Sequence, residues 1–367
     1  MQFFYKNRSF MPPFLQFLIR RFLAIPISLL VITTVIYGGV VLTTPPDVRA
    51  SIYMPETRAR LTEEQRQKQI NLIIKRYHLN EPFPIQYSYW VVSLVRGEWG
   101  YSPSLNNDVL PALLQRTPAT AELAFYSALL FIPLGLLAGV LAGWRQRGKF
   151  DSVFRLLAFL ATSMPSFILA LVLISFFYIG LGWFAPERLS MSLSIHLTPE
   201  NFKAYTGMYT IDGLLNGRLD LVADAFRHLA MPVFTLSIYH WATLGRIARS
   251  SMIAERRREY IIAARARGVR ENRLIWRHAF KNMIAPSFTS LVLSAASLVS
   301  GVFVVEIIFR YNGISDIIVR SMRDVPDAAA ALGFTVYSVV IVLFLMFSLD
   351  VLQAIFDPRV RDEVLRS

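Results

Sequence analysis

Long apolar stretches without a charged residue recur along the chain and predict its main elements. Six runs lack Asp, Glu, Lys and Arg and span at least 18 residues each: 22–46, 123–144, 156–186, 228–245, 282–305 and 328–349. A helix of that length crosses a hydrocarbon layer of about 30 Å. The fourth run is the weakest candidate because it contains His228 and His240. The pattern predicts an all-α polytopic membrane protein with six transmembrane helices.

The positions of Lys and Arg give these helices a direction, because basic residues concentrate in cytoplasmic loops. With the N-terminus inside, the cytoplasmic segments hold 22 basic and 8 acidic residues, and they are 1–21, 145–155, 246–281 and 350–367. The rest of the chain holds 16 basic and 17 acidic residues. This asymmetry accounts for the whole formal net charge of +13. The charge therefore predicts an N-in/C-in topology and not nucleic-acid binding.

The runs and loops also predict how the chain is organised. The expected parts are a cytoplasmic N-terminus at 1–21, a first transmembrane helix at 22–46, an external segment at 47–122, a core domain with five transmembrane helices at 123–356 and a cytoplasmic tail at 357–367. The first run is long for a signal peptide and no small-x-small site follows it, so we expect a retained anchor. The external segment contains an amphipathic stretch for which Thr62 is a candidate helix N-cap.

Two apolar runs carry stripes of small residues. Gly135, Gly139 and Gly143 follow one another at intervals of four in the second run, which lets another helix pack closely. This stripe fits internal packing and a subunit interface equally well. The fifth run has a mildly polar face that fits either helix packing or the lining of a translocation path, formed by Ser294, Ser297, Ser300 and Gly301.

The chemistry missing from the runs narrows the function. Ion-coupled transporters place ionisable residues within the membrane, and the only titratable candidates inside these runs are His228 and His240. The chain has no cysteine, which excludes disulfides and thiolate chemistry. The runs also contain no catalytic constellation, so a membrane enzyme is not favoured. An autonomous ion-coupled carrier or channel remains the alternative to a transporter whose energy comes from another chain.

The basic loop 246–281 between the fourth and fifth runs is the candidate for such coupling. Within it, Ala263, Ala264 and Ala266 lead into Gly268 in an otherwise helical and positively charged stretch. Small residues allow close backbone approach, and glycine allows a sharp turn. The pattern indicates a helix–turn–helix that another protein can grip.

The loop resembles the coupling loop of ATP-binding-cassette (ABC) importer permeases of the dipeptide/oligopeptide/nickel branch. The similarity lies in Glu259-Tyr260, Ala264-Arg265-Ala266-Arg267-Gly268, His278, Asn282 and Pro286, which occur in that family's order. Further similar strings are FLIRRFLAIPISLL (17–30), RGEWGYS (96–102), RTPATAEL (116–123), SMPSF (163–167), RHLAMPVFTL (227–236), EIIFRYNGISDIIVRSMRDVP (306–326) and DPRVR (357–361). Each string is modestly specific, but together they cover nearly all of the chain.

This resemblance implies a type I ABC importer permease in a bacterial inner membrane, with peptides as the first candidate cargo. It implies a coupling helix around Glu259–Gly268 and no cofactor in this chain. The implied partners are a second homologous permease, two ATPase subunits that bind Mg-ATP, an extracytoplasmic binding protein and membrane lipid. Closure of the ATPases on ATP would move the coupling helix as a rigid body.

The resemblance also assigns roles within the coupling helix. Glu259 would pair with a basic group or a helix N-terminus, Ala263 and Ala264 would allow close contact, and Gly268 would make the turn. Arg265 and Arg267 would hold acidic groups or lipid headgroups, or serve topology alone.

The departures from the family pattern are Ile262 before the alanines, and Pro45-Pro46-Asp47, His78, Asn312 and Ser315 in external segments. The external departures leave open how this chain meets its binding protein and cargo.

Overall fold

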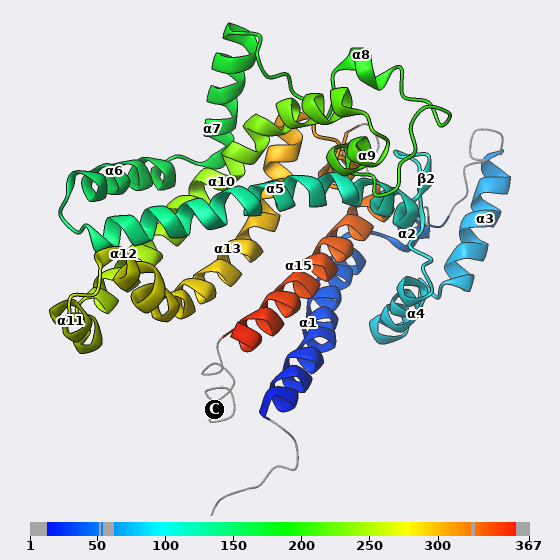
Figure 1. The fold of residues 1–367 in the computed structure, drawn as a ribbon. Coiled ribbons are helices and arrows are strands. Elements are labelled where there is room, and N and C mark those ends of the chain that lie inside the picture. The colour runs from blue at the N-terminus through cyan, green and yellow to red at the C-terminus, as the bar shows by residue number, and fades with distance from the viewer. Residues whose placement is uncertain (1–12, 51–52, 54–61, 324–326, 357–367) are drawn as a thin grey trace, which may run out of the picture.

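The computed structural model describes residues 13–50, 53, 62–323 and 327–356. Residues 1–12 of the expected N-terminus 1–21, the expected tail 357–367 with its DPRVR string, and part of the last external loop lie outside these residues. The long helices are α1 (Pro13–Thr43), α5 (Val109–Trp144), α10 (Leu219–Arg256), α13 (Phe280–Phe309) and α15 (Ala328–Phe356). The structure is almost wholly helical, which confirms the expected fold class (Figure 1).

Shorter elements connect the long helices. They are α2 (Pro46–Ala50), α3 (Glu63–Arg76), α4 (Phe83–Val95), α6 (Lys149–Ser163), α7 (Ser166–Leu173), α8 (Met191–Ser194), α9 (Tyr209–Leu215), α11 (Glu259–Ala266), α12 (Glu271–Arg273) and α14 (Ser315–Ser321), with the π-helical segments η3 (Ile174–Gly180) and η4 (Leu274–Ala279). The two strands β1 (Tyr101–Ser102) and β2 (Asn107–Asp108) form a small antiparallel hairpin in the external segment.

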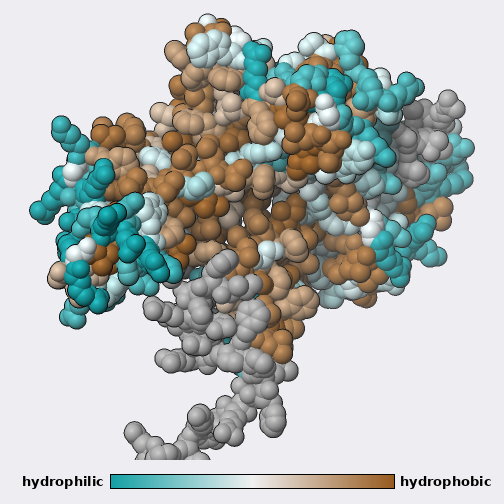
Figure 2. Space-filling model, in the orientation of Figure 1, coloured by the Kyte–Doolittle hydropathy of each residue, from teal (hydrophilic) through white to brown (hydrophobic). Residues whose placement is uncertain are grey.

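Among the described residues, five helices are long and apolar enough to span a membrane, and they are the five long helices. The fourth run lies inside α10, an uninterrupted helix in which His228 and His240 are both buried. A sixth span exists if α6 and the α7–η3 segment count as one bent span. Figure 2 shows hydrophobic surface across the middle of the molecule, with hydrophilic residues gathered over α11–α12 at one end and near α3 and α8 at the other.

The third span differs from the expectation of a single helix over 156–186. α6 begins earlier, at Lys149, and meets the α7–η3 segment at an angle of 99°. The cause lies at the junction, where Met164 adopts an extended conformation (φ −103°, ψ 121°). Pro165 has no N–H to continue the helix and disfavours helical geometry in the residue before it. The run 156–186 therefore folds as two helical segments at a sharp bend and not as one continuous helix.

The glycine stripe of α5 lies against α10, and the two helices run side by side (Figure 1). A Cβ on Gly139 would stand 2.4 Å from the carbonyl oxygen of Gly245, and one on Gly143 would stand 2.6 Å from that of Arg249. A Cβ on Gly135 would stand 3.2 Å from the carbonyl oxygen of Trp241. Of the two alternatives for the stripe, the structure places it in packing within the chain.

The external helix α3 begins as the sequence indicates. The side chain of Thr62 accepts a hydrogen bond from the backbone of Gln65, and the Gln65 side chain accepts one from the backbone of Thr62. This reciprocal pair satisfies two donors that a helix start leaves free. Ile70 then packs with Ala50 and Leu79 in a small apolar cluster. The cap and the cluster order the external segment.

Candidate functional site

The expected coupling helix is the separate short helix α11, which begins at Glu259 and ends at Ala266. The chain turns directly after it, because Gly268 takes a left-handed φ of +80°. The Gly268 N–H donates to the Arg265 carbonyl (2.9 Å), and the Val269 N–H donates to the Ala264 carbonyl (3.2 Å). This pair of bonds is a Schellman motif, which favours glycine at the left-handed position. Gly268 therefore makes the turn that the sequence indicated.

The two faces of α11 have different surroundings. Ile261 and Ala264, three residues apart and thus on one face, are buried against Met252 and Leu274 of the same chain. The opposite face is exposed and carries Glu259, Ile262, Ala263 and Ala266, and the exposed Arg267 follows directly after the helix. Ala264 faces the interior of its own chain, so the expected close contact with a partner through Ala264 was wrong. Ala263 and Ala266 are the alanines that a partner can reach.

Arg265 ties α11 to the end of α5. Its Nε donates to Oε1 of Glu271 (2.7 Å), and the indole N–H of Trp144 donates to Oε2 of the same carboxylate (2.9 Å). The guanidinium of Arg265 also lies 5.5 Å from the centre of the Trp144 ring. The hydrogen bond from Arg265 is the main reason why the pKa of Glu271 lies below its ordinary value. Of the options for Arg265, the structure has it holding an acidic group of its own chain.

Arg256 and Arg249 tie α10 to the same region. Arg256 donates to the carbonyl oxygen of Trp144 (2.6 Å), one of the carbonyls that the end of α5 leaves without a helical partner. Arg249 binds the buried carboxylate of Asp151 on α6 through two hydrogen bonds of 2.5 and 3.0 Å. These contacts join α11 to α5, and α10 to both α5 and α6, at one end of the molecule.

Tyr260 brings together two parts of the loop that are distant in sequence. Its hydroxyl donates to the carboxylate of Glu255 on α10 and accepts from the side-chain amide of Asn282 on α13 (2.8 Å). Tyr260 and Asn282 both belong to the family-like pattern, but nothing in that pattern indicates that they touch. Their contact fixes α11 relative to α10 and α13.

The expected translocation-path residues do not share one surface. Ser294 is buried, whereas Ser297 and Ser300 are exposed. Only Ser297 and Gly301 line a hollow that also borders α7 and α10.

Residues 132–362 match the family of binding-protein-dependent transport system inner membrane components. The chain belongs to this family. The dipeptide transport system permease protein DppB of Alkalihalophilus pseudofirmus is 30% identical over 289 residues, which cover 78% of this chain and 84% of that protein. The DppB protein of Bacillus subtilis is 29% identical over 94% of this chain and 98% of its own length. The oligopeptide transport system permease protein AppB of Bacillus subtilis is 31% identical over 78% of this chain and 83% of its own length.

These findings confirm that the chain is a multi-pass membrane permease subunit of an ABC importer. Such a subunit is a transport component that works with other parts of the importer, and it is not an enzyme. In the part of the permease that the structure describes, no group of three or more His, Asp or Glu side chains could hold a metal ion.

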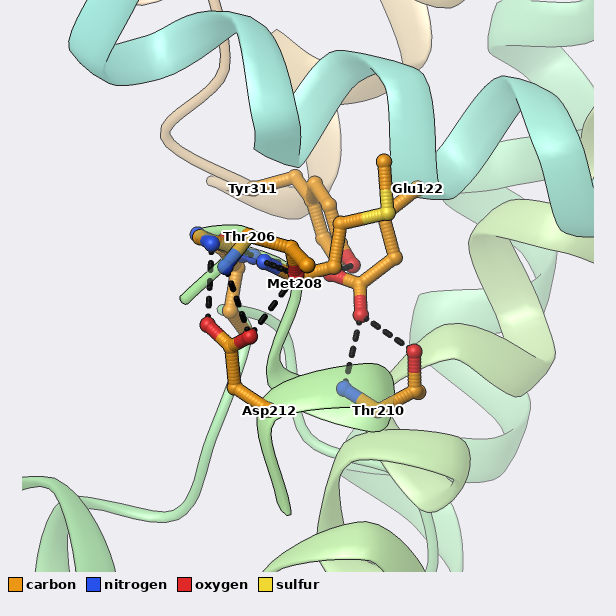
Figure 3. A network of polar contacts seen from close by, with 8 residues as sticks. Glu122, Thr206, Met208, Thr210, Asp212 and Tyr311 are labelled. Atoms are coloured by element: carbon orange, nitrogen blue, oxygen red, sulfur yellow. Dashed lines mark hydrogen bonds and ion pairs between the residues drawn. The ribbon is translucent and has the colours of Figure 1, made fainter. Parts of the chain in front are cut away.

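A buried polar network at the other end of the permease was not anticipated (Figure 3). Glu122 of α5 is 1% exposed and accepts from Arg188 (2.8 Å), from the Tyr311 hydroxyl (3.0 Å) and from the backbone N–H (2.9 Å) and hydroxyl (2.7 Å) of Thr210. Burial, with the adjacent Glu122 carboxylate, raises the pKa of Tyr311 well above its usual value, so it remains a neutral donor. A neighbouring carboxylate, Asp212, accepts from the backbone of Thr206.

This network fixes the segment before α10 and the turn after α13 onto α5. Its members lie 66, 88 and 189 positions from Glu122, so no local sequence pattern could show them. The signal that was available is a carboxylate directly before the apolar run 123–144. A charge at such a place needs partners when the helix continues past it.

Proposed function

We propose that this permease forms the translocation path for di- and oligopeptides in an ATP-driven importer. The peptide cargo is supported by the relatives, which are named as dipeptide and oligopeptide permeases. The proposed assembly contains a second, homologous permease, two ATPase subunits that bind Mg-ATP, and an extracytoplasmic binding protein that delivers the peptide. We place the coupling contact in the loop 246–281.

The observation that carries the coupling assignment is the two-sided geometry of α11. Its outer face presents Glu259 and, beside the exposed Ile262, the small side chains of Ala263 and Ala266, so the backbone at these two alanines is open to close approach by an ATPase. It is attached to the membrane helices through the buried side chain of Ile261 and through Arg265, whose partner Glu271 also accepts from Trp144 of α5. A helix held in this way moves with the spans to which it is attached, and that is what transmission of an ATPase closure requires.

The test is made in the assembled importer in lipid vesicles. Glu259→Arg reverses the exposed charge in the first turn of α11, and Gly268→Pro is incompatible with a φ of +80° because proline holds φ near −65°. Both variants are expected to insert and to lose peptide-stimulated ATP hydrolysis. The matched control is Glu63→Arg, which reverses an exposed acidic residue at the same position of the external helix α3. Normal stimulated hydrolysis in both α11 variants would contradict the coupling assignment.

The partners are tested by purifying the permease from its native membrane in mild detergent. Co-purification of a second permease and ATPase subunits is the expected result. A chain that purifies alone and moves solute without ATP would favour the autonomous carrier instead.

A further inference from the structure

The break in the third span borders a hollow of about 360 Å³ that also touches α10 and α13. Residues 162–166 of the break form one wall, Tyr239 and His240 of α10 form another, and Ser297 and Gly301 of α13 complete it. Discontinuous membrane helices are a recurrent way to build substrate sites, because the freed backbone groups can serve a ligand. Of the four residues of α13 that were candidates for the translocation path, Ser297 and Gly301 reach this hollow.

Three hydroxyl groups around the hollow, those of Thr162, Ser163 and Ser297, are left as hydrogen-bond acceptors. Thr162 donates to the Ala158 carbonyl (2.9 Å), Ser163 to the Phe159 carbonyl (2.8 Å) and Ser297 to the Ser294 carbonyl (3.0 Å). A hydroxyl has one proton and two lone pairs, so each of these oxygens still accepts but no longer donates. The described residues that line the hollow carry no Asp, Glu, Lys or Arg. The wall therefore suits N–H groups without selecting for charge.

Groups on the other walls have unused hydrogen-bonding capacity. His240 is 4% exposed, and its Nδ1 has no hydrogen-bond partner among the described residues. At the start of α7 the amide of Ile168 makes the first turn bond, to the Pro165 carbonyl (3.0 Å). The amides of Ser166 and Phe167 precede that bond, so the helix itself leaves them without partners. In a membrane such groups need protein, water or a ligand.

We propose that this hollow is a contact site for the main-chain amides of a peptide in transit. Peptide N–H groups would bind the oxygens of Ser163 and Ser297, and peptide carbonyls would bind the free amide at Ser166. Every peptide carries these main-chain groups whatever its side chains are, so an uncharged site fits cargo of varied sequence. This inference rests on the proposed function, because it requires that peptides pass through the permease.

The first experiment measures how main-chain N-methylation of a peptide slows its transport by the reconstituted importer. Methylation removes the N–H, and the slowing factor is compared between the wild-type permease and the variants Ser297→Ala and Ser163→Ala. The binding protein is the same throughout, so its own preference cancels in this double-mutant comparison. The matched control is Ser300→Ala, an exposed serine of α13 outside the hollow.

We expect the penalty for methylation to shrink by roughly 2- to 12-fold in the Ser297 or Ser163 variant, the range for one hydrogen bond, and to stay unchanged in Ser300→Ala. An equal penalty in all four proteins would overturn the inference. If the wild-type assembly hydrolyses ATP but moves no peptide, the proposed peptide cargo is wrong. This result is distinguished from failure of the contact site because it is seen with the wild-type permease, before any variant is measured.

A second experiment uses the absence of cysteine in the natural chain, which makes Ser297→Cys a single-thiol variant. A hydrophilic thiol reagent should modify it in the assembled importer, and transported peptide should protect it. Ser300→Cys should show no such protection. A Ser297→Cys thiol that is inaccessible, or that cross-links to the second permease, would overturn the inference because a subunit would then fill the hollow.

Discussion

Gly139→Ala tests the claim that α5 and α10 are held together by backbone contact. Gly139 lies in the middle of the stripe, where an added Cβ would stand 2.4 Å from the Gly245 carbonyl oxygen and 2.7 Å from the Ala248 Cβ. Ordinary contacts of a Cβ lie at 3.4–4 Å. The two helices must therefore separate by on the order of 1 Å, or one of them must bend, to admit a single methyl group.

The magnitude follows from comparison with a glycine that has no neighbours. A Cβ on Gly39 in α1 would meet nothing within 4 Å. Alanine favours a helix over glycine by up to about 1 kcal/mol, and this gain is common to Gly39→Ala and Gly139→Ala. The difference between the two variants therefore isolates the steric term. Overpacking of this kind typically costs about 1–3 kcal/mol.

The assay is the midpoint of thermal unfolding of the detergent-solubilised permease. Gly39→Ala should leave the midpoint unchanged or raise it slightly, and Gly139→Ala should lower it. Gly135→Ala should have a smaller effect than Gly139→Ala, because its nearest contact is 3.2 Å and not 2.4 Å. Equal midpoints for Gly39→Ala and Gly139→Ala would refute the close contact between α5 and α10.

Three further predictions concern charges and caps. Arg188→Leu leaves the buried carboxylate of Glu122 without its cation and should lower the free energy of unfolding by about 3–5 kcal/mol. The double variant with Glu122→Gln should regain part of this stability. The midpoint of thermal unfolding measures both variants. The hydrogen bond from Arg265 lowers the pKa of Glu271 in the folded state. The stability that this bond contributes is therefore fully present at pH values above the ordinary pKa of glutamate, near 4.5, and it is lost as the pH falls through the lowered pKa. Trp144 fluorescence should report this acid transition, and Glu271→Gln should abolish it. Thr62→Ala should cost about 1 kcal/mol and speed hydrogen exchange in the first turn of α3, with Ser88→Ala as a neutral comparison.

Apolar patterning predicted where the spanning helices lie, because each long uncharged run must be buried in lipid or protein. It did not predict where the helices end. The helix α5 starts at Val109, well before the run that begins at 123, since Arg116 and Glu122 find partners within the fold. Pro165 was visible in the third run, but a proline in a sequence does not state the angle of the resulting bend. That angle depends on how α6 and α7 pack on α10.

The coupling region was predictable in outline because its turn has a local cause. Gly268 supplies the left-handed conformation that few other residues adopt, and it does so next to its own helix. The orientation of Ala264 was not predictable, since three alanines close together leave the buried face of a short helix ambiguous. The links from Trp144 to Glu271 and from Tyr260 to Asn282 depend on tertiary contacts, which one sequence does not reveal.

The length of α5 gives the two ends of the permease a mechanical relation. Trp144 and Glu122 are 22 residues apart on this helix, which corresponds to about 33 Å. A tilt of about 5° at the Trp144 end would therefore displace the Glu122 end by about 3 Å, more than a hydrogen bond tolerates. Pro133 lies between these two ends and is where α5 bends most easily. The helix α10 stiffens α5 where the glycines bring the two backbones together. The polar network around Glu122 must therefore shift as a unit with α5, or break, each time the Trp144 end moves.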